Sequence, residues 1–138
     1  MGPEISVMDA VGPVLGGLVF IGVMSLVPEP ARHKLNLLLV AGVSGVYISG
    51  GGFGVWELAY PALMMPVLYL ALNSYRWIGI GWLMHSGWDI AHYLWGQPIW
   101  PFQATSSFGC MLFDAVIALW FIAGARSVWW QESEAVKA

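Results

Sequence analysis

Five apolar runs, separated only by short polar, glycine or proline segments, constrain this chain more than any other feature. They occupy residues 11–27, 35–51, 53–72, 77–95 and 108–125. A helix needs about 20 apolar residues to cross the hydrocarbon core of a bilayer, which is about 30 Å thick. The runs therefore predict an all-α integral membrane protein, folded as a compact bundle of five transmembrane helices with lipid around it.

Composition excludes several other classes of protein. Apolar residues make up 59% of the chain and charged residues 9%, and the mean hydropathy is +0.71, which is unlike a water-soluble domain. A net charge of −3 without a basic patch argues against a nucleic-acid partner. The first ten residues, "MGPEISVMDA", lack the basic start of a cleaved signal peptide. We expect a single transmembrane domain over residues 1–138.

The basic residues predict the orientation in the membrane. The second run is short and ends in "SGGGFG", which leaves open a re-entrant turn. If all five runs cross, however, every Lys and Arg falls on one side of the membrane: Arg32, Lys34, Arg76, Arg126 and Lys137. The positive-inside rule then favours five crossings of the cell inner (plasma) membrane. The N-terminus lies outside, and residues 126–138 form a cytoplasmic tail.

The stretch "HSGWDIAH" places His85, Asp89 and His92 at i, i+4 and i+7, on one face of the fourth helix. At about 1.5 Å per residue they lie about 15, 9 and 5 Å below the outer end of that helix. By the same measure Glu57 lies about 6 Å and Asp114 about 9 Å deep. An ionised carboxylate at the centre of a membrane helix costs roughly 2.5–3.5 kcal/mol. Because no Lys or Arg falls in this layer, a metal ion, protons or admitted water must compensate the charge.

The spacing suggests which residues would hold a metal ion. Asp89 and His92 have the i, i+3 spacing of carboxylate and histidine ligands in helical bundles. Glu57 and Asp114 would complete a shell of nitrogen and oxygen ligands suited to zinc, iron or manganese. His85 would carry protons, so that His85 and Asp89 are the candidate catalytic residues. A complete di-iron set would need further carboxylates from a homo-oligomer.

Three function classes stay open at this point. The first is a metal-dependent enzyme that acts on a small or lipid-like substrate. The second is a proton- or cation-coupled transporter component, in which the same carboxylates titrate. The third is a structural subunit of a membrane complex, whose polar cluster only locks helices together. The single cysteine, Cys110, excludes an intramolecular disulfide and is either packing or a soft ligand near the cluster.

Two sequence elements carry a family resemblance. The pattern His-x-x-Trp-Asp-x-x-His spans residues 85–92, and Ile-Trp-Pro-Phe spans residues 99–102. With "GVWELAY" they resemble a family of small bacterial multi-pass membrane proteins described as domain of unknown function 6010. The matching positions are Glu57, His85, Trp88, Asp89, His92, Trp100, Pro101, Cys110 and Asp114. The resemblance implies a multi-pass topology and the same polar residues, and it implies no reaction.

Overall fold

The computed structural model describes residues 3–130, and within that range the chain is entirely helical. The elements are α1 (Val7–Met24), α2 (Ala31–Val43), the 3₁₀ helix η1 (Gly54–Leu58), α3 (Ala59–Ala71), α4 (Tyr75–Trp95) and α5 (Ser106–Ile122). The predicted all-α class is confirmed for this range. Residues 131–138, which hold most of the predicted tail and Lys137, lie outside it.

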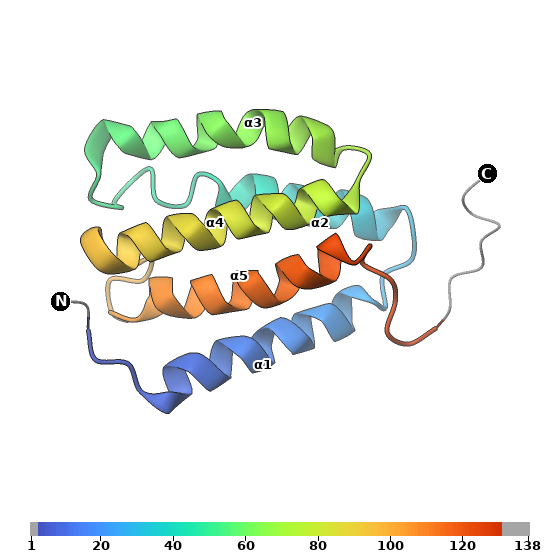
Figure 1. Cartoon of the computed structure of the whole chain (residues 1–138), viewed down its shortest axis with the longest axis horizontal. Helices are drawn as coiled ribbons and strands as arrows, with labels where there is room; N and C mark the ends of the chain where they lie inside the picture. Colours follow the sequence, from blue (N-terminus) through green and yellow to red (C-terminus); the bar gives the residue numbers. More distant parts are fainter. Residues whose placement is uncertain (1–2, 131–138) are drawn as a thin grey trace.

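The five α-helices lie side by side along the long axis of the molecule (Figure 1). Helix α4 is central and contacts α2, α3 and α5, while α1 packs on the other side of α5. Helix α1 begins with a capping box, in which the Ser6 hydroxyl accepts from the Asp9 amide and the Asp9 carboxylate accepts from the Ser6 amide. Because α4 contacts three other helices, one of its faces lies at the centre of the bundle.

Two helical segments in the described range are long and apolar enough to span a membrane, Val7–Met24 and Gly54–Ala71. A shorter apolar helix covers Ser106–Ile122. Helix α4 has 21 residues, but its buried face includes polar side chains. Five transmembrane crossings are therefore not confirmed and stay a prediction.

The second predicted crossing differs from a continuous helix over residues 35–51. Helix α2 ends at Val43, and the chain continues as a series of turns. The Ser44 hydroxyl donates to the carbonyl of Val40 at 2.9 Å, which gives the polar side chain a partner on the preceding turn. Glycines 50–52 then disfavour helix because of their conformational freedom. The turns continue in the direction of α2 toward the opposite end of the bundle (Figure 1).

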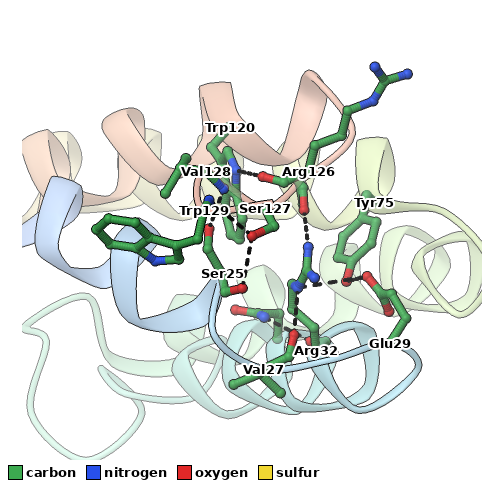
Figure 2. A network of polar contacts seen from close by, with 12 residues as sticks. Ser25, Val27, Glu29, Arg32, Tyr75, Trp120, Arg126, Ser127, Val128 and Trp129 are labelled. Carbon is green, nitrogen blue, oxygen red and sulfur yellow. Dashed lines mark hydrogen bonds and ion pairs between the residues drawn. The ribbon is translucent and has the colours of Figure 1, made fainter. Parts of the chain in front are cut away.

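The end of the bundle that carries the basic residues is fastened by one buried arginine. Arg32 belongs to α2 instead of a loop, and its side chain is fully buried. Its Nε donates to the Val27 carbonyl at 2.9 Å and its Nη1 to the Ala125 carbonyl at 2.7 Å. Figure 2 shows these bonds joining the α1–α2 connection to the segment after α5, with Glu29 and Tyr75 beside them. Arg32 is thus a structural clamp at this end.

We predict that Arg32→Met destabilises the protein. The Val27 and Ala125 carbonyls lose their charged donor, and each unsatisfied buried group costs about 1–3 kcal/mol. Thermal unfolding of the purified protein measures the loss. Arg126→Met is the matched control, because Arg126 is exposed and uses its carbonyl, which accepts from Trp120, in this network. Equal melting temperatures for the two variants would contradict the clamp.

Close packing of α4 on α5 generates a second prediction. A Cβ atom at Gly79 would lie 2.7 Å from Ile122 Cγ1 and 2.8 Å from the Ala118 carbonyl oxygen. Gly79→Ala therefore forces the two helices apart, at a cost of about 1–3 kcal/mol. On the same helix, Gly87 has nothing within 4 Å of such a Cβ. Gly87→Ala should leave stability unchanged or raise it by about 0.5–1 kcal/mol through helix propensity, and thermal melts that rank the variants the other way would refute the packing argument.

Candidate metal centre

The buried face of α4 carries the three polar residues that the sequence placed on one face. His85 is 3% exposed, Asp89 0% and His92 1%. Glu57 from η1 and Asp114 from α5 are also buried, each at 3%. All five predicted site residues therefore lie inside the bundle, but they do not form one group.

Three of them meet around the Nδ1 atom of His85. Nδ1 lies 2.7 Å from Asp114 Oδ2 and 3.3 Å from Asp89 Oδ2. The other ring nitrogen, Nε2, lies 3.0 Å from the carbonyl oxygen of Val43, at the end of α2. We call His85, Asp89 and Asp114 the inner cluster.

The Val43 carbonyl sets the ligand atom of His85. A carbonyl can only accept, so Nε2 must carry a proton and donate it. Metal-bound histidines commonly donate their second N–H to a backbone carbonyl in this way. Nδ1 is then the nitrogen that faces the two carboxylates, and one ligand atom from each of the three residues lies within 4.8 Å of the others. The inner cluster could hold a metal ion.

Glu57 and His92 form a separate pair. His92 Nε2 lies 3.0 and 3.2 Å from the two carboxylate oxygens of Glu57, and Nδ1 donates to the Trp88 carbonyl at 2.9 Å. Glu57 Oε1 also accepts from the Phe53 amide at 3.0 Å. Both nitrogens of His92 are therefore engaged. The sequence grouped Asp89 with His92 as ligands, whereas the structure places His92 against Glu57 and Asp89 against His85.

Tyr47 joins the inner cluster to this pair. Its hydroxyl lies 2.7 Å from Asp89 Oδ1, to which it donates, and 2.9 Å from the Ser107 hydroxyl. Its ring stacks on His92 with centroids 3.5 Å apart. Sequence analysis missed Tyr47, because a tyrosine in an apolar run gives no signal. Its position depends on the turns that follow α2, which no spacing rule anticipates.

Cys110 lies near the inner cluster and lines a cavity of about 390 Å³. The cavity is bounded by the first turns of α1 and α5 and by the segment before α5, including Asp9, Trp100, Thr105 and Phe113. It has an apolar wall and a polar rim, where the Thr105 hydroxyl donates to Asp9 at 2.7 Å. The cavity thus lies between α1 and α5, and Cys110 and Phe113 of α5 line it.

The inner cluster and the Glu57–His92 pair both lie in the part of the chain that matches a known family. The profile of a family of unknown function, DUF6010, matches residues 8–127. The chain belongs to this family. No curated protein and no solved structure matches the chain significantly. Membership confirms the family resemblance seen in the sequence, while the bacterial and membrane character that the resemblance implied stay predictions.

The Gly-rich turn closes directly over the Glu57–His92 pair in this DUF6010 chain. A Cβ atom at Gly51 would overlap Glu57 Oε1 and lie 2.5 Å from His92 Nε2. The Gly51 carbonyl accepts from the Gln97 amide at 2.8 Å, which ties the turn to the segment after α4. The backbone therefore leaves no room for a substrate at the pair. We call Glu57 and His92 the clasp, because their contact holds the Gly-rich turn against α4.

We predict that Gly51→Ala separates Glu57 from His92 and lowers stability by about 1–3 kcal/mol. Gly50→Ala is the neighbouring control, because nothing lies within 4 Å of a Cβ at Gly50. Thermal unfolding and the imidazole NMR signals of His92 report the two effects. Unchanged His92 signals in Gly51→Ala would show that the turn does not press on the pair.

Proposed function

We propose that this chain is an integral membrane protein whose inner cluster binds a divalent metal ion, and that it is a metal-dependent enzyme acting on a small or lipid-like substrate. The observation that carries the proposal is the inner cluster itself. Two buried carboxylates converge on one histidine nitrogen, and the sequence places no Lys or Arg at that depth.

The distribution of polarity supports a lipid environment. The bundle exposes large apolar side chains on its surface, including Val7 at 77%, Leu38 at 70% and Leu119 at 67%. Only 6% of the Val7–Met24 window and 28% of the Gly54–Ala71 window is buried, whereas the core helix of a soluble protein is mostly buried. Exposed apolar area of this extent needs a lipid or protein partner, and polar groups inside an apolar exterior are typical of membrane bundles.

The orientation follows from the ends of the helices. The start of α2, the start of α4 and the end of α5 lie together at one end (Figure 1). Lys34, Arg76 and Arg126 are exposed at that end. The positive-inside rule assigns it to the cytoplasm. The N-terminus, the Gly-rich turn and the cavity beside Cys110 then face outward.

The donor set favours a borderline transition metal. One imidazole nitrogen and two carboxylate oxygens suit zinc, iron or manganese, and three protein ligands leave coordination positions for water or substrate. In this proposal His85 becomes a ligand instead of a proton carrier. Glu57 and His92 act as a clasp, and Tyr47 orients Asp89 from the outer shell of the site.

A bound ion of this kind would act as a Lewis acid and lower the pKa of a coordinated water. Asp89 and Asp114 would fix its position, and the Val43 carbonyl would hold the His85 ring in place. The cavity beside Cys110 would admit a substrate with a polar group and an apolar body, because its lining has both characters.

A proton- or cation-coupled transporter component is the rival function, and the interrupted second helix favours it, since transporter sites are often built at broken helices. Against it, apolar side chains fill the bundle between the inner cluster and the basic end, among them Val40, Ile78, Ile117 and Phe121. The buried polar residues of α2 in that half are Arg32, which donates to the Val27 and Ala125 carbonyls, and Asn36, which donates to the Arg32 carbonyl. Flux in proteoliposomes that disappears in Asp89→Asn would favour the transporter.

Metal analysis of the purified protein tests the proposal. Wild type loaded with zinc, iron or manganese and then dialysed should retain about one ion per chain. His85→Ala, Asp89→Asn and Asp114→Asn should lose it, since each removes one of the three ligands. Glu57→Gln is the control, because it alters the clasp and spares the ligands.

Circular dichroism of each variant serves as the control for folding. A folded wild type that retains no metal, or metal that persists in all three ligand variants, would refute the inner cluster as a metal site. Loss of metal in Glu57→Gln alone would support the grouping of Glu57 with His92 as ligands.

A further inference from the structure

Unpaired polar atoms are concentrated around the inner cluster. Over residues 3–130, four buried side-chain atoms have no hydrogen-bond partner: Asn36 Oδ1, Tyr60 Oη, Trp82 Nε1 and Asp89 Oδ2. Asn36 is in α2, where its amide nitrogen donates to the Arg32 carbonyl. Tyr60 and Trp82 are neighbours of the His85 ring, and Asp89 is a member of the inner cluster. Buried polar groups nearly always have partners, so this concentration needs a physical cause.

The two unpaired donors come from different helices and flank the same ring. The Tyr60 ring of α3 lies 5.9 Å from the His85 ring, and the Trp82 ring of α4 lies 6.2 Å from it. Tyr60 is 5% exposed and Trp82 is 4% exposed, so solvent does not satisfy them.

The chemistry of these groups specifies the ligand. An indole N–H can only donate, and a phenol can donate its single proton. Asp89 Oδ2 is an acceptor that a metal ion would use. A ligand that satisfies both donors beside the ion must present lone pairs and preferably negative charge, because hydrogen bonds to charged acceptors are the stronger ones.

We propose that the inner cluster takes a small anion as an external metal ligand, either hydroxide or the oxyanion group of a substrate, with Tyr60 and Trp82 as its hydrogen-bond donors. This inference rests on the proposed metal site and extends it to the class of ligand. Tyr47 does not share this role, because its hydroxyl is already engaged with Asp89 and Ser107.

Azide binding to the cobalt-loaded protein tests the proposal. Cobalt(II) replaces zinc in nitrogen and oxygen sites and has visible absorption bands that change when an anion joins the metal. Azide should shift these bands in wild type. Tyr60→Phe, which removes one oxygen atom, should weaken azide binding about tenfold or more, while cobalt affinity measured without azide should change less, because the Tyr60 hydroxyl makes no hydrogen bond to the three ligand residues.

Two further variants sharpen the experiment. Trp82→Phe removes the second donor and should weaken azide binding by a similar factor. Tyr93→Phe is the matched control, because the Tyr93 hydroxyl donates to the Pro3 carbonyl instead of the inner cluster. It should leave azide binding unchanged.

The outcomes separate this inference from the proposed function. If cobalt binds and azide affinity is the same in wild type, Tyr60→Phe and Trp82→Phe, the anion site is wrong and the metal site stands. The same holds if cobalt binds and azide has no effect on wild type. If folded wild type binds no cobalt, both proposals fall together.

Discussion

Burial of two carboxylates against one imidazole is the constraint on which the rest of this structure depends. Asp89 and Asp114 lie 3.3 and 2.7 Å from His85 Nδ1, inside a bundle whose exterior is apolar. One histidine can carry one positive charge, so it cannot neutralise both acids. In the proposed function a further cation would balance the group, and Asp89 Oδ2, which makes no hydrogen bond shorter than its 3.3 Å contact with His85 Nδ1, would bind it.

The surrounding helices position the three residues of the inner cluster. Helix α4 supplies two of the three residues of the inner cluster, and α5, packed closely on α4 at Gly79, supplies the third. The end of α2 contributes the Val43 carbonyl, which fixes the His85 tautomer. Because α2 stops there, the following turns bring Tyr47 to Asp89 and Gly51 to the Glu57–His92 pair. The interruption of α2 is therefore part of the site.

The two histidines of the "HSGWDIAH" stretch have different surroundings and different roles. His92 is stacked by Tyr47, held by Glu57 and covered by the backbone of Gly51, so that it fastens the turns after α2 to α4. His85 is flanked by unpaired donors from Tyr60 and Trp82. Rigid fastening on one side of Tyr47 and unsatisfied polarity on the other suit a preorganised site beside a structural clasp.

The sequence by itself determined the helical class, the choice of polar residues and the shared face of His85, Asp89 and His92, because helical periodicity and the cost of burying charge are local or compositional rules. Only the tertiary structure decided that Asp89 joins His85 and Asp114 while His92 joins Glu57. Spacing along one helix cannot tell which neighbouring helix supplies the nearer carboxylate. The roles of Tyr47 and Arg32 were likewise decided there, since both depend on where irregular segments pack against distant parts of the chain.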